Sequence, residues 1–290
     1  MGSDEKFKLV AYESDFSMPS MNVECTKSIV YTAAVKVSVQ LKPLNSIKQC
    51  LFYSEPCFIH GNLRFKSFAD TVLYLRTLNF NLDSNLDKKQ CCESLALCNL
   101  VQSKLKPVIE FVYWVDPRNC EEFTNVWYMR ALPLPFNYWH MRRLKQKAEL
   151  LIETLYPTES NLEIVREFLN KTAVECLSSL STRLGKSEYF YGSLPSTLDV
   201  VVYSHIAPLV KVPFPSNEIS NLVTMWPNLV DLVKRIDAAY FRELPKDSKY
   251  FKEVQRVKSN DDDVSYVAVL LLTISAASLV VGFAINRGYI

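Results

Sequence analysis

The stretch TRLGKSEYFYGSLPSTLDVVVYSHIAPLV, residues 182–210, contains the clearest helix start in the sequence. Within it, Ser196 is followed three residues later by Asp199, and a strongly apolar run comes directly after. A Ser followed at this spacing by an acid can satisfy amide groups that have no partner in the first turn of a helix. The spacing therefore predicts a structural capping box, Ser196 and Asp199, at the start of a buried helix.

Helical periodicity extends on both sides of this stretch. From Asp87 to Val112, apolar residues recur at helical spacing, and Pro107 within that run predicts a kink. Further amphipathic helices are predicted over residues 141–155 and 162–184, and a last one starts at Pro227 and runs through Tyr240. Residues 114–139 combine large rings with several prolines, so we expect rigid turns there.

The first part of the chain mixes strand and helix signals. Apolar or alternating runs predict strands, and Pro43 is expected to close the second of them. Ser67, with Asp70 three residues later, predicts the start of a helix. The expected order is a strand at 7–12, a helix at 23–35, a strand at 37–41, a hairpin of 57–59 and 63–65, and a helix from 67. This order is typical of a small α/β layer.

Together these elements resemble the glutathione-transferase architecture, in which a Ser/Thr-x-x-Asp box starts the core helix of the C-terminal domain. The resemblance implies an α+β, mostly α fold, with a thioredoxin-like N-terminal domain over residues 1–82 and an all-helical C-terminal domain over 83–245. A linker over 246–263 and a C-terminal transmembrane helix over 264–285 complete the expected organisation.

Two blocks resemble the metaxins more closely within that superfamily. One is WVDPRNCEEFTNVWYMRALPLPFNYW, residues 114–139, and the other is the stretch at 182–210. The metaxins are subunits of the mitochondrial outer-membrane sorting and assembly machinery. The resemblance implies a non-catalytic subunit that aids insertion of β-barrel precursors on the cytosolic face. Its implied partners are a second metaxin-like subunit, the β-barrel core subunit of the complex and the precursors themselves.

The residues that glutathione chemistry requires are poorly represented. Four hydroxyls follow the first strand without a recognisable catalytic pattern: Tyr12, Ser14, Ser17 and Ser20. Pro56 is a candidate cis-proline before the third strand. The family's Gln or Glu before Ser is replaced here by Lys66 before Ser67, which argues against glutathione binding. We therefore predict no enzyme activity and no cofactor. The alternative is a tail-anchored, glutathione-transferase-like protein of mitochondrial dynamics or transport that uses thiol chemistry at Cys25 or Cys57.

Large aromatic side chains cluster in the block at 114–139. Buried, they would form an inter-domain core; exposed, they would anchor a protein interface. The sequence leaves both interpretations open. The candidates are Trp114, Trp127, Tyr128, Phe136 and Trp139.

Residues 264–285, VSYVAVLLLTISAASLVVGFAI, contain no charged residue and no proline. About 20 apolar residues in a helix span a hydrocarbon core roughly 30 Å thick. Three aspartates precede the run and Arg287 follows it. The run predicts a membrane tail anchor with the bulk of the chain in the cytosol; a buried core helix is the alternative. Its composition and basic flank favour the mitochondrial outer membrane over the endoplasmic reticulum. Representative anchor residues are Val264, Leu271, Ile274, Val280 and Ile285.

Composition excludes other classes of function. The formal net charge is +2, and no basic stripe that would bind nucleic acid is present. None of the eight cysteines forms a CxxC pair, so we predict no metal site.

Overall fold

The computed structural model describes residues 6–45, 50, 56–159, 161–248 and 250–251 of the chain. The chain divides into two units, Met1–Ser248 and Lys249–Ile290. All elements discussed below belong to the first unit. The predicted boundary between residues 82 and 83 lies inside this unit and stays a prediction. The predicted anchor, residues 264–285, lies outside the described residues, and no helix among the described residues is long and apolar enough to cross a membrane.

A sheet of four described strands forms the first layer. They are β1 (Phe7–Ala11), β2 (Val39–Pro43), β3 (Cys57–His60) and β4 (Leu63–Phe65). The strand order is β2-β1-β3-β4, with β1 and β2 parallel and the other pairs antiparallel. The hairpin of β3 and β4 turns at Gly61, whose φ of 58° suits glycine. The α/β order predicted for this part is therefore confirmed.

Strand β2 departs from the sequence prediction at both ends. It begins two residues after the predicted start at Val37 and extends past the predicted end at Leu41, with Pro43 as its last residue. Pro43 pairs with Ala11 of β1, and β2 lies at an edge of the described sheet. Proline is tolerated at a sheet edge because no further strand needs its missing amide hydrogen.

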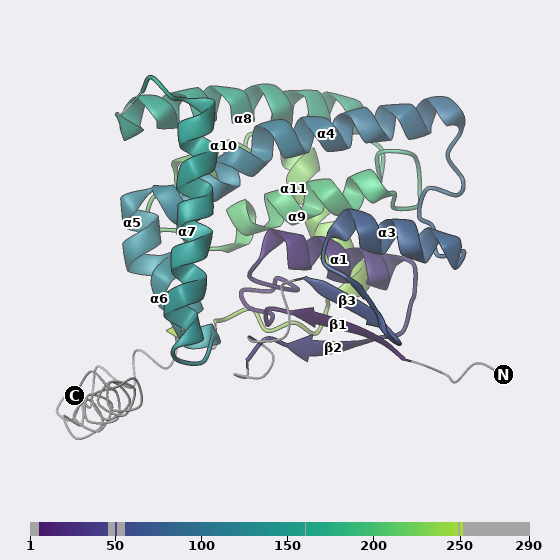
Figure 1. Ribbon diagram of the computed structural model, residues 1–290. Coiled ribbons are helices and arrows are strands. Elements are labelled where there is room, and N and C mark those ends of the chain that lie inside the picture. Colours follow the sequence, from purple (N-terminus) through teal and green to yellow (C-terminus); the bar gives the residue numbers. More distant parts are fainter. Residues whose placement is uncertain (1–5, 46–49, 51–55, 160, 249, 252–290) are drawn as a thin grey trace, which may run out of the picture. The chain divides into compact units, whose positions relative to one another are not determined.

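Two capped helices cover one face of the sheet, α1 (Val23–Ala34) and α3 (Phe68–Thr77) (Figure 1). The Asn22 side chain accepts hydrogen bonds from the Glu24 and Cys25 amides, at 2.9 and 3.2 Å. The Ser67 hydroxyl accepts one from the Asp70 amide at 3.1 Å. The sequence prediction of a helix start at Ser67 is confirmed.

The remaining described elements are helical. The long helices are α4 (Lys88–Glu110), α7 (Phe136–Leu155), α8 (Leu162–Leu184), α9 (Thr197–Lys211) and α11 (Pro227–Tyr240). The shorter ones are α5 (Pro117–Asn119), α6 (Asn125–Ala131) and α10 (Glu218–Val223), with π-helical turns η1 (Phe111–Val115) and η2 (Cys120–Thr124). The sequence predicted α8 with the same bounds, residues 162–184.

Two helical regions were not predicted from the sequence. The expectation of rigid turns over 114–139 is wrong for residues 117–131, which form α5, η2 and α6, and α7 starts at Phe136. Here the large rings pack against each other and stabilise short helices whose aromatic residues have only moderate helix propensity. Helix α10 is too short to show a clear periodicity.

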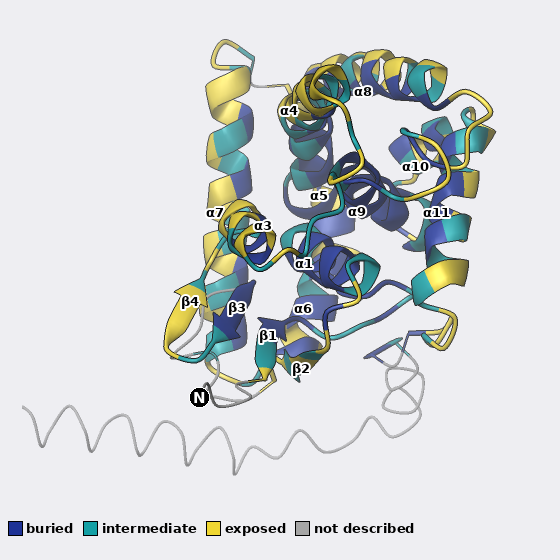
Figure 2. Cartoon of the chain, turned by 90° about the vertical axis from the view of Figure 1, so that its right-hand side faces the viewer, coloured by how far each residue is buried: buried dark blue, intermediate teal, exposed yellow. Residues whose placement is uncertain are grey.

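Helix α9 lies at the centre of the unit (Figure 2). It packs against α1, α4, α10 and α11, and twelve of its fifteen residues are buried. Helices buried on all sides are apolar all round. This explains why the strongest helix signal of the sequence marks the core.

Candidate functional site

Three of the five candidate aromatic side chains are in the core. Trp114, Trp127 and Tyr128 are 4%, 0% and 1% exposed. The rings of Trp114 and Tyr128 lie 4.9 Å apart, and Tyr128 meets Tyr12 at 5.3 Å. Tyr12 follows β1, so these rings join the sheet layer to η1 and α6. Their position is that of packing residues.

Trp139, by contrast, is 78% exposed, and Phe136 is half-buried. Three further apolar side chains on α6, α7 and the turn between them are also exposed: Met129, Leu134 and Tyr138. We call Met129, Leu134, Tyr138 and Trp139 the α6–α7 surface. Trp and Tyr are enriched among residues that dominate binding energy at protein interfaces. This surface is therefore a candidate for protein binding.

Asp15 connects distant segments and was not found from the sequence. Its carboxylate accepts hydrogen bonds from Trp127 Nε1 at 2.7 Å and from the Ser248 hydroxyl at 2.6 Å. All three residues are buried, and Asp15 is 0% exposed. Nothing in the local sequence signals such a contact, because the partners lie more than 100 residues away.

Ser196 and Asp199 lie at the start of α9. Asp199 accepts hydrogen bonds from the Ser196 amide at 2.8 Å, the Ser196 hydroxyl at 2.6 Å and the Phe190 amide at 3.1 Å. A second carboxylate, Asp83, accepts from the amide and hydroxyl of Thr197 at 2.9 and 2.7 Å. Burial raises the pKa of Asp199 to about 6. The helix start is thus held by two acids, one of which sequence reasoning missed.

Two of the four candidate hydroxyls donate hydrogen bonds elsewhere, and both candidate thiols are buried. The Ser20 hydroxyl donates to the Tyr12 carbonyl at 2.9 Å, and Ser17 donates to the Pro245 carbonyl. Cys25 and Cys57 are 0% and 1% exposed. Burial raises the pKa of Cys57, which disfavours the reactive thiolate.

The glutathione-site candidates around β3 and β4 are placed as follows. Pro56 is buried directly before β3; its bond to residue 55 lies outside the described residues, so its cis character stays a prediction. Lys66 is exposed, and the Ser67 hydroxyl is used in capping α3. Among the described residues, no group of three metal-ligating side chains comes together.

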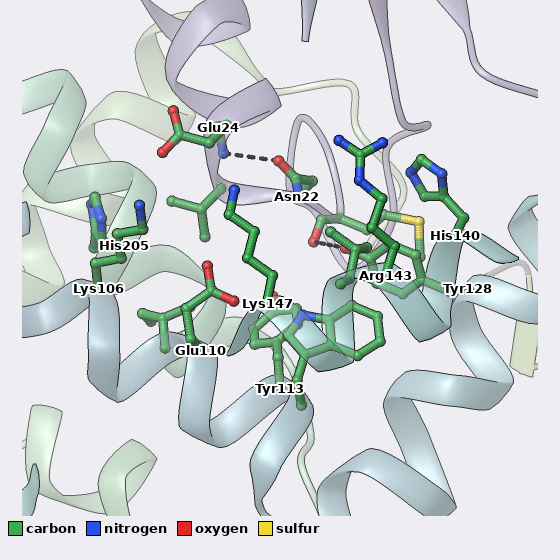
Figure 3. Close-up of a pocket in the computed structure, with 15 residues that line it drawn as sticks. Asn22, Glu24, Lys106, Glu110, Tyr113, Tyr128, His140, Arg143, Lys147 and His205 are labelled. Atoms are coloured by element: carbon green, nitrogen blue, oxygen red, sulfur yellow. Dashed lines mark hydrogen bonds between the residues drawn. The ribbon is translucent and has the colours of Figure 1, made fainter. Parts of the chain in front are cut away.

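A pocket of about 120 Å³ lies between α1, α4, α7 and α9 (Figure 3). Its walls bring together residues that are far apart in the sequence. Charged side chains are contributed by Glu24, Lys106, Glu110, Arg143 and Lys147. Uncharged polar groups include Asn22, Tyr113, His140 and His205. The sequence analysis did not predict this arrangement, because four separate helices create it.

His205 is one of the most deeply buried side chains of the pocket. It is 1% exposed, and its Nδ1 lies 2.8 Å from the Val201 carbonyl oxygen. Because a carbonyl can only accept, Nδ1 carries the proton and donates. Burial lowers the pKa of His205 to about 4, so the ring is neutral at pH 7 and Nε2 is an acceptor. No hydrogen-bond partner of His205 Nε2 is present in the described structure.

Two acids of the pocket differ in their environment. Burial raises the pKa of Glu24, but the Lys27 ammonium at 2.6 Å outweighs it and the net shift is downward. Burial also raises the pKa of Glu110, and no ion pair with Glu110 is present among the described residues. Glu24 is therefore neutralised by Lys27, whereas Glu110 remains a separate acid facing the pocket.

Replacing His205 with leucine is expected to reduce the loss of stability in acid. The imidazole takes up a proton near pH 6.5 when unfolded but only near pH 4 when folded, so the wild-type chain loses stability as pH falls between these values. At about 1.4 kcal/mol per pKa unit, the variant should lose roughly 3 kcal/mol less. Urea unfolding of both proteins at pH 4 and 7 measures the difference. A parallel acid dependence in the two proteins would contradict the burial of a neutral ring.

Comparison with known proteins places this architecture in a family. Residues 25–145 match a family model described as outer mitochondrial membrane transport complex protein, and residues 173–236 match the C-terminal domain of glutathione S-transferase. Metaxin-3 of Danio rerio is 27% identical over 244 residues, which cover 82% of this chain and 77% of the relative. Metaxin-1 of Mus musculus is 27% identical over 238 residues, covering 81% and 75%. The chain belongs to the metaxin family.

The fold of this metaxin is that of the glutathione transferases. A glutathione transferase from Phanerochaete chrysosporium superimposes with a TM-score of 0.54 over 82% of this chain and 98% of that chain. The sequence identity is 14%, so the likeness shows the fold alone. The glutathione-transferase-like fold expected from the sequence, mostly helical with one small sheet, is confirmed.

Proposed function

We propose that this metaxin is a non-catalytic subunit of the sorting and assembly machinery of the mitochondrial outer membrane. It aids insertion and assembly of β-barrel precursors by binding proteins on the cytosolic face. The observation that carries the proposal is the match of residues 25–145 to the outer mitochondrial membrane transport complex family, with metaxins similar over most of the chain. Its partners are a second metaxin-like subunit, the β-barrel core subunit and the precursors.

The α6–α7 surface supports a binding role. It presents Trp139 at 78% exposure on α7 and Leu134 at 71% in the turn before it. Exposed aromatic side chains bury a large apolar area when a partner covers them. We assign this surface to the contact with the second metaxin-like subunit.

The thioredoxin-like layer supports the non-catalytic role. Cys57 is buried with a raised pKa, and the Ser20 hydroxyl is bonded to the Tyr12 carbonyl. A glutathione thiolate needs an accessible hydroxyl or thiol beside it. These contacts leave Cys57 and Ser20 unsuited to that role, which disfavours the thiol chemistry of the alternative function.

The predicted tail anchor completes the proposal. Residues 264–285 are apolar and long enough for a bilayer, and we propose that they attach the chain to the outer membrane. Confinement to the membrane plane raises the effective concentration of the binding surface near its partners.

Depletion of this protein is expected to reduce assembled porin in the outer membrane at least twofold while import into the matrix continues. The physical reason is that loss of a binding subunit weakens only the complex that contains it. Assembly of radiolabelled porin into isolated mitochondria, resolved on native gels, measures the effect, with a matrix-targeted precursor as control. Normal porin assembly after complete loss would contradict the assembly role. Retention of the purified full-length chain on glutathione resin would contradict the proposal that this chain takes no part in glutathione chemistry.

A further inference from the structure

The pocket between α1, α4, α7 and α9 contains two buried polar atoms that protein groups do not satisfy. They are Nε2 of His205 and the hydroxyl oxygen of Tyr113, on side chains from residues that are 1% and 3% exposed. Both line the same pocket (Figure 3). A buried polar atom without a partner costs free energy, so such atoms indicate a site for water or a ligand.

The two atoms require different partners. His205 Nε2 is an acceptor, since Nδ1 donates to Val201 and the ring is neutral at pH 7. It therefore needs a ligand hydroxyl or amine. Burial raises the pKa of Tyr113, so its hydroxyl keeps its proton and can donate to an acidic oxygen. A ligand that satisfies both atoms carries a donor and an acceptor.

Positive charge dominates the rest of the pocket. Lys106 on α4 and Arg143 and Lys147 on α7 line it, and none of them forms an ion pair with a described residue. Of the two acids, Glu24 is paired with Lys27 at 2.6 Å, which leaves Glu110 to oppose three cations. The excess of two positive charges matches a dianion, and Arg can hold a carboxylate with two parallel hydrogen bonds.

We propose that this pocket binds a small dianionic organic acid that carries a hydroxyl group. Its carboxylates contact Lys106, Arg143 and Lys147, and its hydroxyl donates to His205 Nε2. The volume of the pocket is about 120 Å³. Arg143 and Lys147 are solvent-exposed, so the ligand enters from the α7 side.

This pocket does not include the candidate glutathione-binding residues around β3 and β4. No residue of β3 or β4 lines the pocket, and neither do Pro56, Lys66 or Ser67. The proposal therefore does not depend on glutathione recognition. It also goes beyond the proposed protein-binding role, because the α6–α7 surface contributes none of its four residues to the pocket.

Malate and succinate provide a sharp test, because they share both carboxylates and differ by one hydroxyl. Equilibrium dialysis of the full-length chain in mild detergent, at about 0.15 M ionic strength, measures both affinities. We expect one malate per chain and at least tenfold weaker binding of succinate, which leaves His205 Nε2 unpaired. No saturable malate binding, or equal affinity for the two acids, would overturn the proposal. Inorganic phosphate that displaces malate at equal concentration would also overturn it, since that result shows only charge attraction.

Variants on the exposed side of the pocket locate the site. Arg143→Gln and Lys147→Gln are each expected to weaken malate binding about tenfold, because each removes a charge-assisted contact. Lys145→Gln is the matched control: it lies on the same helix, pairs with Glu149 at 4.0 Å and does not line the pocket. It should leave binding unchanged, and an equal loss in all three variants would overturn the assignment. His205→Asn removes the Nε2 acceptor and is expected to bring the malate and succinate affinities together; the comparison in the wild-type chain remains decisive if this variant does not fold.

Discussion

Replacing Asp199 with alanine is expected to lower the free energy of unfolding by about 3 to 4 kcal/mol. The carboxylate is 0% exposed and accepts three hydrogen bonds, from the Ser196 amide, the Ser196 hydroxyl and the Phe190 amide. Its loss leaves buried donors unpaired, and each costs about 1 to 3 kcal/mol. For a chain of this size, the melting temperature should fall by roughly 10 °C.

A matched control distinguishes the effect of losing the helix cap from the effect of losing a negative charge. Asp231 is an exposed acid on α11 that pairs with Lys234 at 3.0 Å, and Asp231→Ala should change stability by less than about 0.5 kcal/mol. The free energy of unfolding of Asp199→Asn should fall between those of the two alanine variants, because the amide oxygen of Asn can still accept a hydrogen bond from the Ser196 amide. Thermal and urea unfolding of the four proteins provide the comparison. Equal losses in Asp199→Ala and Asp231→Ala would show that the cap does not stabilise α9.

The double substitution Tyr138→Ala and Trp139→Ala is expected to reduce recovery of the second metaxin-like subunit at least tenfold. The two side chains are 60% and 78% exposed, so their removal should alter stability by less than about 1 kcal/mol. At an interface, truncation of a central aromatic residue costs about 2 kcal/mol or more. Purification of the tagged full-length chain in mild detergent, with quantitative mass spectrometry of bound proteins, measures the loss.

Leu95→Ala is the control for this surface. Leu95 is 65% exposed on α4 and lies outside the α6–α7 surface, so its replacement removes exposed apolar area elsewhere. We expect normal recovery of the partner with this variant. If the α6–α7 variant recovers as much partner as Leu95→Ala, the surface assigned to the second subunit is wrong, and the assembly role would then rest on another face.

Local signals predicted much of the fold. Ser67 begins α3, the turn at Gly61 joins β3 and β4, and α8 has the predicted bounds. These features depend on residues within one or two turns of each other, so a single sequence contains the information. The extension of β2 to Pro43, two residues past its predicted end, was missed because the tolerance of proline depends on the position of β2 at the sheet edge, which local sequence does not show.

Less of the candidate sites than of the fold could be predicted from the sequence. The pocket combines Lys106, Arg143, Lys147 and His205 from three helices, and no spacing along the chain connects them. Asp15 was missed for the same reason, since Trp127 and Ser248 approach it only after folding. Polar residues of this kind are common on surfaces, and only their burial distinguishes them.

The sequence by itself determined the helix start at residues 196–199, because hydrogen bonding between a capping residue and its acid three positions later is local. It also determined the apolar character of α9, and hence its place in the core. Only the tertiary structure decided which aromatic side chains of residues 114–139 are buried and which are exposed. Trp127 is 0% exposed because Phe16, Phe123 and Asp15 surround it, whereas Trp139, twelve residues later, is 78% exposed. Burial depends on neighbours brought from distant parts of the chain, and that information appears only when the layers pack together.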